Sequence, residues 1–370
     1  MEIKSPHFNI LSKKSRVLVV PLDWGLGHAT RCIPLINELL AQGCEVLIAG
    51  EDGIRSLLQT EFPNLLFISL KGYRIKYSRN KYWLAFKIFW QLPGILFSVY
   101  REHKWLNKVV MKYSLDAVIS DNRFGLYHSI IPSVYITHQL MIKTGNTLSE
   151  NIAQKIHYWF IKKFNHCWIP DFEGTEAIAG ELSQPVLLPL NVKYLGCFSR
   201  FEKKEVVAKK YDLLIIISGP EPQRTFIEEI LLDQLGQYKG SALFIRGLPG
   251  NSEGIKQYGN TAIHIIDHIP AKELNEAIQQ AHLVISRSGY TTLMDLIKLQ
   301  QKAILIPTPG QTEQEYLARH LMQQKIFYCM EQQTFSLEKA LNEVKNFPFY
   351  IPSFDMEQYK KAIRQFVKSL

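Results

Sequence analysis

The sequence contains two successive series of short, continuous apolar runs, each rich in β-branched residues and of strand length. In the first half of the chain the runs lie at 16–22, 44–50, 65–70, 116–121 and 133–138. In the second half they lie at 211–219, 241–247, 262–267, 282–289 and 302–307. Because helix-like stretches alternate with these runs, both faces of each sheet should be covered, which is typical of parallel strands. The sequence therefore predicts an α/β protein with two doubly wound, Rossmann-like parallel sheets.

The two series divide the chain of 370 residues into two domains. The first domain is predicted to cover 1–200 and the second 201–352, with the boundary in the charged, weakly patterned stretch 197–210. A C-terminal helix is expected within 353–370, and we expect it to return to the first domain. Ligands of open α/β sheets bind beyond the carboxyl ends of the strands, so the motif-bearing loops of both domains should face a central cleft.

Positive charge is concentrated in one segment of the first domain. The chain carries a formal net charge of +9, and the segment 71–112 alone holds ten Lys or Arg residues against one acid, Glu102. Such a local excess indicates contact with an anionic surface in one region and argues against a general nucleic-acid binder.

Aromatic residues are interleaved with the charges of 71–112, and aromatic side chains favour the headgroup region of a bilayer. Lys87, Pro93 and Gly94 interrupt its apolar part, so the segment should not span a membrane. We therefore expect 71–112 to touch an anionic membrane surface. The alternative is a pair of helices whose aromatic faces belong to the core and whose charges are solvated.

Cysteine usage and the N-terminus indicate a cytoplasmic protein. The cysteines are Cys32, Cys44, Cys167, Cys197 and Cys329. They are scattered and form no C-x-x-C pair, which argues against a disulfide framework and against a zinc site. The N-terminus has no signal-peptide pattern, and no uninterrupted apolar stretch of about 20 residues follows. At most, the chain is expected to lie peripherally on the inner face of the cytoplasmic membrane.

The stretch SRSGYTTLMD, which follows a predicted strand of the second domain, has the features of a phosphate-binding turn. Its informative residues are Arg287, Ser288, Gly289, Thr291 and Thr292. The unpaired N–H groups and positive dipole end of the helix that begins here would face a ligand above the sheet. The hydroxyls and the guanidinium can add donors and charge. A plain strand–helix turn with Thr as N-cap is the alternative.

Two further motifs indicate contacts with a nucleotide sugar. Asp295, one turn into the same helix, could accept two hydrogen bonds from a ribose diol. In the next strand–helix loop, within 306–320, Glu313 and Gln314 can receive and donate hydrogen bonds to sugar hydroxyls. As an alternative, these two are simply favourable first-turn residues of a helix. Their occurrence after neighbouring strands favours a shared site.

The stretch PLDWGLGHATRCIP has the form of a dinucleotide-binding loop with one change. Gly25, Gly27 and Thr30 occupy the three glycine places of the G-x-G-x-x-G pattern, but His28 stands directly behind the second glycine. An oxidoreductase is one interpretation of this loop. That interpretation leaves the motifs of the second domain unexplained.

On these motifs, the second half of the chain resembles the donor-binding domain of GT-B glycosyltransferases, particularly family 28, and is similar to the UDP-glycosyltransferases of family 1. The resemblance covers most of 211–325 and implies a GT-B fold with an acceptor-binding first domain and a donor-binding second domain. It implies that the turn at 287–292 holds the donor diphosphate and that Asp295 binds the ribose. It also implies that Glu313 and Gln314 hold the donor sugar.

The resemblance assigns roles to two more loops of the second domain. DHIP matches the loop in which a backbone group, here that of Ile269 beside His268, reads the uracil edge. SGPEPQR, at 218–224, departs from the Gly- and Ser-rich loop of the family, because its prolines remove two backbone donors. Arg224 would compensate by reaching the diphosphate.

In the first domain the resemblance rests on the loops. Family members carry a Gly-rich loop that ends in Gly-His, which here contains Gly25 and Gly27. His28 would be the base that takes the proton of the acceptor hydroxyl, and Asp121 would orient it. The alternatives are a packed helix-start residue for the histidine and a cap for the aspartate. His138 is a candidate for the acceptor side.

The resemblance implies an inverting glycosyltransferase that moves a hexose or N-acetylhexosamine from a UDP-sugar to a hydroxyl of a glycan, glycolipid or lipid-linked acceptor. No D-x-D sequence occurs, so no metal or other cofactor is expected, and helix dipole and arginine charge would stabilise the departing UDP. A nucleotide-sugar epimerase of the same fold and a non-catalytic nucleotide-sugar-binding subunit are the alternatives.

Overall fold

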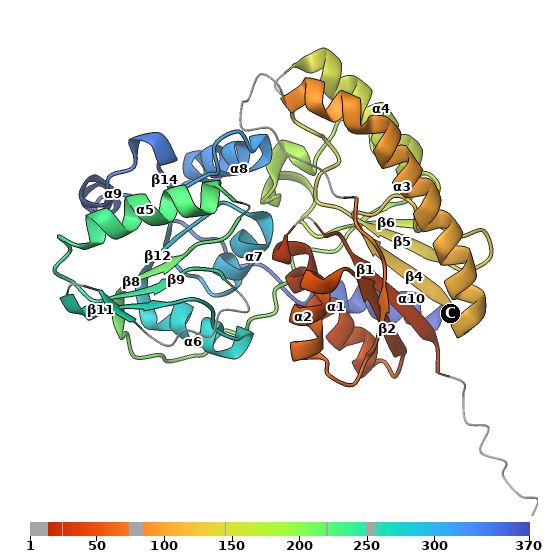
Figure 1. The fold of residues 1–370 in the computed structure, drawn as a ribbon, viewed down its shortest axis with the longest axis horizontal. Coiled ribbons are helices and arrows are strands. Elements are labelled where there is room, and N and C mark those ends of the chain that lie inside the picture. The colour runs from red at the N-terminus through yellow and green to blue at the C-terminus, as the bar shows by residue number, and fades with distance from the viewer. Residues whose placement is uncertain are drawn as a thin grey trace, which may run out of the picture.

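The chain forms two α/β domains that lie side by side (Figure 1). The computed structural model describes residues 14–23, 25–73, 84–144, 146–219, 221–248, 256–258 and 260–370. Each domain is a sheet with helices on both faces, so the predicted pair of doubly wound sheets is confirmed.

The first sheet is parallel throughout the described residues. Its strands are β1 (Arg16–Pro21), β2 (Glu45–Gly50), β3 (Leu66–Ser69), β4 (Ala117–Asp121), β5 (Ser133–Ile136), β6 (His166–Ile169) and β7 (Val192–Tyr194). Their order across the sheet is β3–β2–β1–β4–β5–β6–β7. The helices are α1 (Leu26–Ala41), α2 (Asp52–Glu61), α3 (Leu84–Tyr113) and α4 (Thr147–Ile161). The order reverses between β1 and β4, as in a Rossmann sheet.

The second sheet repeats this plan with an antiparallel edge strand. Its strands are β8 (Tyr211–Ile216), β9 (Ala242–Ile245), β10 (Lys256–Tyr258), β11 (Asn260–Ile266), β12 (Ala281–Ser286), β13 (Ala303–Leu305) and β14 (Tyr328–Cys329). Their order is β10–β11–β9–β8–β12–β13–β14, and only β10 is antiparallel among the described pairs. The helices are α5 (Gln223–Leu235), α6 (Ala271–Gln280), α7 (Tyr290–Lys298), α8 (Thr312–Gln323), α9 (Leu337–Val344) and α10 (Gln358–Lys368). Short 3₁₀ helices lie at Gly174–Glu176, Gly180–Leu182 and Gln332–Thr334.

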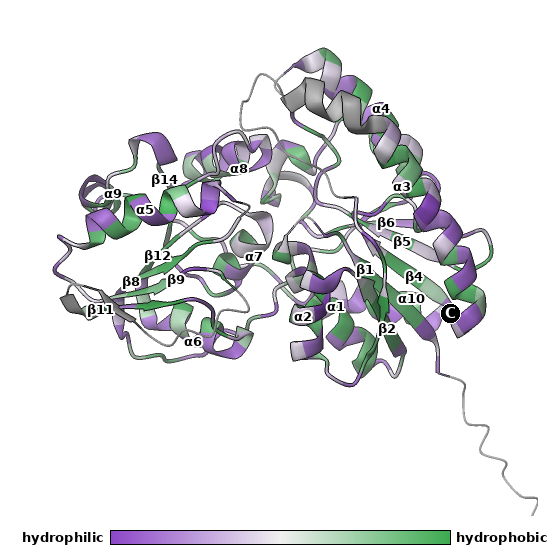
Figure 2. Ribbon diagram, in the orientation of Figure 1, coloured by the Kyte–Doolittle hydropathy of each residue, from purple (hydrophilic) through white to green (hydrophobic). Residues whose placement is uncertain are grey.

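The central strands consist largely of hydrophobic residues, which are green in Figure 2. In the first sheet, Val17 and Val19 pack under α1, whereas Leu18 and Val20 pack under α3. All four side chains are fully buried. The continuous apolar runs of the sequence therefore arise because each strand is covered from two sides.

Each domain contains a segment that comes from the other half of the chain. Helix α10, the last helix of the chain, packs on α1 of the first domain, and its Ile363 and Phe366 join the core of the first sheet. In the opposite direction, Phe172, Ile178 and Leu182, which precede the predicted boundary, belong to the core under α7 and α8.

Candidate functional site

The predicted motifs follow the strands at which each sheet reverses its order. In the first sheet, β1 and β4 are neighbours, and Pro21 is in register with Asp121. In the second sheet, β8 and β12 take the same places, and Ile216 is in register with Ser286. Helices α1 and α7 start just beyond β1 and β12, so their N-termini are the elements that a ligand at the switch points would meet.

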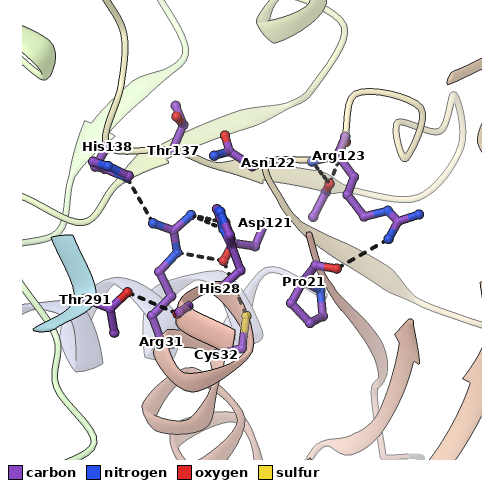
Figure 3. Close-up of polar contacts among 12 residues, drawn as sticks. Pro21, His28, Arg31, Cys32, Asp121, Asn122, Arg123, Thr137, His138 and Thr291 are labelled. Carbon is purple, nitrogen blue, oxygen red and sulfur yellow. Dashed lines mark hydrogen bonds and ion pairs between the residues drawn. The ribbon is translucent and has the colours of Figure 1, made fainter. Parts of the chain in front are cut away.

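The start of α1 is in contact with the start of α7. Gly25, which precedes α1, has φ of 109°, a conformation that L side chains rarely adopt. The carbonyl of Gly27 accepts hydrogen bonds from Thr30 Oγ1 at 2.9 Å and from Thr291 Oγ1 at 3.0 Å (Figure 3). A Cβ on Gly27 would lie 3.4 Å from Thr291 Oγ1, which is ordinary van der Waals contact, so this position is close to the second domain without being sterically restricted to glycine.

His28 lies in the first turn of α1 beside the carboxylate of Asp121. Nδ1 of His28 is 3.2 Å from Oδ1 of Asp121, and the histidine side chain is 17% exposed. Among the described residues, Nε2 of His28 has no hydrogen-bond partner. Burial lowers the pKa of His28, and the attraction of Asp121 does not fully offset this effect. A neutral imidazole can act as a general base through Nε2 in the tautomer that carries its proton on Nδ1.

Arg31, one turn further along α1, also binds Asp121. Its Nε donates to Oδ2 of Asp121 at 2.6 Å, and its Nη2 donates to Oδ1. Nη2 also lies 2.9 Å from Nδ1 of His28. Burial alone would raise the pKa of Asp121, but the Arg31 charge and His28 outweigh burial and hold that pKa well below its ordinary value.

His138 connects this group to the second domain. Nη1 of Arg31 is 3.0 Å from Nδ1 of His138, and Nε2 of His138 is 2.6 Å from Oε1 of Glu313 on α8. The ring of His138 stacks on Tyr290 of α7, with centroids 4.2 Å apart and planes 3° apart. Burial opposes ionisation of Glu313, but His138 lowers the pKa of this carboxyl overall. The structure thus brings His28, Asp121, His138 and Glu313 together.

The predicted diphosphate turn precedes α7. The N-cap of this helix is Gly289, which has no side chain that could cap the first backbone N–H groups. Ser288 Oγ donates to the carbonyl of Gln314 at 2.8 Å, and Thr291 is bonded to Gly27. Thr292 is part-exposed, so its hydroxyl is accessible. The backbone N–H groups at this helix start are therefore available to an anion.

Arg287 lies behind this turn and is almost fully buried. Its guanidinium donates to three backbone carbonyls, those of Gln223, Ile306 and Pro307. No carboxylate among the described residues pairs with it, and its Nε has no hydrogen-bond partner. Burial lowers the pKa of Arg287 to about 10, so the group is still a cation at neutral pH. It contributes an uncompensated positive charge beneath the helix start.

Asp295, the predicted ribose ligand, lies one turn into α7. Its Oδ1 accepts a hydrogen bond from Ser199 Oγ, a residue of the segment between the domains. Burial raises the pKa of Asp295 to about 6, against the opposing effects of Arg200 and of the Ser199 hydroxyl. The second carboxylate oxygen, Oδ2, has no hydrogen-bond partner among the described residues.

Gln314, the predicted sugar ligand beside Glu313, is held by its own loop. Its Oε1 accepts from the backbone N–H of Thr308 at 3.0 Å, and its Nε2 donates to Gln311 at 2.6 Å. The hydroxyl of Thr308 is buried and has no partner. Gln314 therefore shapes the loop that follows β13 in addition to any role toward a sugar.

Arg224, His268 and Ile269 are the remaining predicted site residues of the second domain. Arg224 is buried in ion pairs with Glu221, at 2.5 Å, and with Glu228. It would have to exchange these partners to reach a diphosphate, so its predicted role remains a prediction. The spacing Glu-x-x-Arg-x-x-x-Glu is visible in the sequence and indicates these pairs. His268 is exposed and Ile269 is half-buried, directly after β11.

Two site residues were not predicted from the sequence. Arg31 lies in an amphipathic helix, where an arginine is normally solvated, and Ser199 lies in a linker without a motif. Both are recognised only through residues far away in the sequence, Asp121 and Asp295. Among the described residues, no group of three or more His, Cys, Asp and Glu side chains is arranged to hold a metal ion.

Comparison of the sequence with known proteins identifies the family of the chain. The model of the glycosyltransferase family 28 C-terminal domain matches residues 227–369. The UDP-N-acetylglucosamine--N-acetylmuramyl-(pentapeptide) pyrophosphoryl-undecaprenol N-acetylglucosamine transferase of Desulforamulus reducens is 30% identical over 365 residues, which cover 93% of this chain and 90% of the relative. The chain belongs to glycosyltransferase family 28. It is a glycosyltransferase, and the resemblance of its motifs to the family is confirmed.

Solved structures show the same fold as this family 28 chain. The glycotransferase of kitacinnamycin matches with a TM-score of 0.63 at 12% identity, over 96% of both chains. A structure described as a putative UDP-N-acetylglucosamine 2-epimerase from Listeria monocytogenes matches with a TM-score of 0.58 at 12% identity, over 96% of this chain and 98% of that chain. The predicted GT-B fold is therefore confirmed.

Proposed function

We propose that this family 28 glycosyltransferase transfers N-acetylglucosamine, with inversion, from its UDP-sugar to a hydroxyl of a lipid-linked glycan acceptor. The observation that supports the proposal is the position of His28, with Nε2 free, at the contact between α1 and α7. The relative from Desulforamulus reducens carries this donor and this class of acceptor in its name.

In the proposed reaction the acceptor oxygen attacks the anomeric carbon of the donor. The bond from that carbon to the UDP oxygen breaks, a glycosidic bond forms on the opposite face, and Nε2 of His28 takes the acceptor proton. Asp121 stabilises the resulting imidazolium across 3.2 Å. The electron pair of the broken bond leaves with UDP, whose charge meets the N-terminus of α7 and the buried cation of Arg287.

The proposal is tested by incubating the protein with UDP-N-acetylglucosamine and a lipid-linked muramyl-pentapeptide acceptor. Release of UDP together with a β-linked product is the expected result. Conversion of the sugar without transfer would instead support the epimerase alternative. Binding of UDP without any turnover would support the non-catalytic alternative.

Transfer should survive chelation. Because the proposed leaving-group stabilisation uses a helix N-terminus and a guanidinium, we expect full activity in EDTA. The measurement is UDP release before and after chelation, with added Mg²⁺ or Mn²⁺ as the comparison. Loss of activity in EDTA and its recovery with either metal would contradict this account.

Replacement of Asp295 should weaken UDP binding. If the carboxylate holds a ribose hydroxyl, Asp295→Ala should cost about 1–3 kcal/mol of UDP affinity by calorimetry. Because the pKa of Asp295 is raised to about 6, the ionised acceptor is present above that pH, and UDP affinity should fall as the pH drops below it. Because the terminal phosphate of UDP also titrates at about pH 6, the pH profile is compared with that of Asp295→Ala. Unchanged binding in the variant would exclude the ribose role.

We also propose that helices α3 and α4 carry the membrane-facing surface of the first domain. Val99 of α3 and Phe160 of α4 belong to one apolar cluster, so the two helices meet, and both are drawn at the outer edge of this domain in Figure 1. Along α4 the exposed apolar residues are spaced by four, four and three positions, so they form one stripe. The stripe consists of Leu148, Ile152, Ile156 and Trp159. Lys163 lies 3.5 Å above the Trp159 ring, so a cation accompanies the apolar stripe.

Helix α3 continues this surface with Leu96, Phe97 and Tyr100, all more than half exposed. Part of the predicted basic segment, 74–83, lies outside the described residues. In the part of the chain that the structure describes, no helix combines the length and the apolar character needed to cross a bilayer. Exposed apolar and aromatic side chains beside lysines are suited to an anionic headgroup layer.

Anionic vesicles should bind the protein at low salt and release it as the salt concentration rises. We expect co-sedimentation to diminish when Lys76, Arg79, Lys81 and Lys87 are changed together to Gln. The matched control changes four exposed lysines of the second domain to Gln, at Lys239, Lys272, Lys302 and Lys339. Equal loss in both quadruple variants, or no binding at low salt, would remove the membrane proposal and leave the transferase proposal intact.

A further inference from the structure

Arg31 lies in the middle of a buried hydrogen-bond chain that crosses from the first domain to the second. Its Nε and Nη2 donate to the two oxygens of Asp121, and its Nη1 is 3.0 Å from Nδ1 of His138 (Figure 3). The chain continues over 2.6 Å from Nε2 of His138 to Glu313. A single set of contacts thus connects the surroundings of the proposed base with the residue proposed to hold the donor sugar.

Donor and acceptor rules assign the tautomer of His138. A guanidinium has only donors, so Nδ1 of His138 must accept from Arg31 and carries no proton. The proton of the neutral ring then lies on Nε2 and is donated to Glu313. The ring of His138 is also stacked on Tyr290. Its orientation is therefore fixed by Arg31, Glu313 and Tyr290 together.

Nδ1 of His28 has two partners that require opposite tautomers. It lies 2.9 Å from Nη2 of Arg31, which can only donate, and 3.2 Å from Oδ1 of Asp121, which can only accept. If Nδ1 accepts from Arg31, the proton of the neutral ring is on Nε2, and the ring cannot take a proton from an acceptor hydroxyl there. If Nδ1 donates to Asp121, Nε2 is free to act as the base.

We propose that Arg31 is a positioning residue that selects the tautomer of His28, and that His138 couples this selection to occupation of Glu313 by the donor sugar. The inference rests on the proposed function, because it uses the base role of His28 and the sugar role of Glu313. A sugar hydroxyl that binds Glu313 competes with His138 for the carboxylate. Arg31, no longer anchored through His138, keeps its bonds to Asp121 but turns Nη2 away from Nδ1 of His28, which then donates to Oδ1 of Asp121. Nδ1 of His28 takes a proton from solvent as Nε2 releases one.

Nitrogen NMR of the histidine rings tests the proposal directly, since it distinguishes Nδ1–H from Nε2–H rings. Signals are assigned with His28→Gln and His138→Gln. In the free protein we expect both rings as Nε2–H tautomers. With UDP-N-acetylglucosamine, His28 should change to the Nδ1–H form, whereas UDP alone should leave it unchanged. An Nδ1–H ring of His28 in the free protein, or an equal response to UDP alone, would overturn the proposal.

Variants of Arg31 separate this inference from a structural role. In Arg31→Lys the forked guanidinium is lost, so His28 should be in the Nδ1–H form without any ligand. The charged and titratable groups around His28 are Asp121, Arg31, His138, Glu313 and Cys32. In Arg31→Gln one cation that lowers the pKa of His28 is removed, so the midpoint of His28 titration should rise. An unchanged tautomer in the lysine variant would refute the proposal.

Kinetics provide the functional readout. Arg31→Lys and His138→Gln remove the switch that binding of the donor sugar must drive, so both should lower the KM for UDP-N-acetylglucosamine and retain the affinity for UDP. The matched control Arg55→Lys, on an exposed turn of α2, should change neither. If Arg31→Gln does not fold, the lysine variant and His138→Gln still decide the question. If the wild-type protein neither binds nor turns over UDP-N-acetylglucosamine, the proposed donor is wrong, whereas the ligand-free tautomers still test the role of Arg31.

Discussion

His28→Ala should lower kcat by about 10²- to 10⁴-fold and leave UDP affinity nearly unchanged. The factor is the usual contribution of a positioned general base. UDP affinity should persist because the proposed diphosphate and ribose contacts are made by α7 and its preceding turn, on the second domain. Turnover is measured with saturating donor and acceptor, and UDP binding by calorimetry on the same preparation.

Asp295→Ala is the matched comparison for this variant, because it should lose UDP affinity while His28 stays in place. An equal loss of UDP affinity in both variants would contradict the division of roles between the domains. Unchanged turnover in His28→Ala would require a different base, and the non-catalytic alternative would then need to be reconsidered.

Asp121→Ala should lower the free energy of unfolding by about 3–5 kcal/mol. Removal of one partner of a buried ion pair leaves the other charge without compensation, and the Arg31 side chain is only 2% exposed. Denaturant unfolding measures the loss. The control is Glu45→Ala, which breaks the exposed pair with Arg16 and should cost no more than about 1 kcal/mol.

The pH dependence of this stabilisation has a definite sign. The pKa of Asp121 is held below that of an unfolded aspartate. The stabilisation that the ionised Asp121 gives the folded protein is therefore complete above about pH 4 and is lost as the pH falls further. The difference in stability between wild type and Asp121→Ala should therefore shrink in acid. A difference that stays constant down to pH 2 would show that the ion pair is not its source.

The central strands of both sheets could be predicted because they are buried on two faces and therefore read as unbroken apolar runs. The edge strands β7 and β14 could not, since they have three and two residues and depend on pairing with a neighbour. The start of α7 could be predicted because the residues that begin a helix are neighbours in the sequence.

The predicted site residues differ in how locally they are determined. His28 and Asp121 could be named because the Gly-His loop after the first strand and the acid at 121 resemble positions of the family, and these signals lie within short stretches of sequence. The contact between His138 and Glu313 could not be predicted, because it depends on how the two domains are placed. Arg31 was missed for a related reason: its partner carboxylate is 90 residues away in the sequence.

The segment that each domain contains from the other half of the chain limits how this enzyme can be recombined with its relatives. A cut at residue 200 separates Phe172, Ile178 and Leu182 from the core under α7, and it separates α10 from the core beside α1. Each half would then present an apolar surface that its own chain no longer covers. A chimera that exchanges donor specificity must therefore transplant the second domain with residues 172–182 included, and must match α10 to the α1 surface on which it lies.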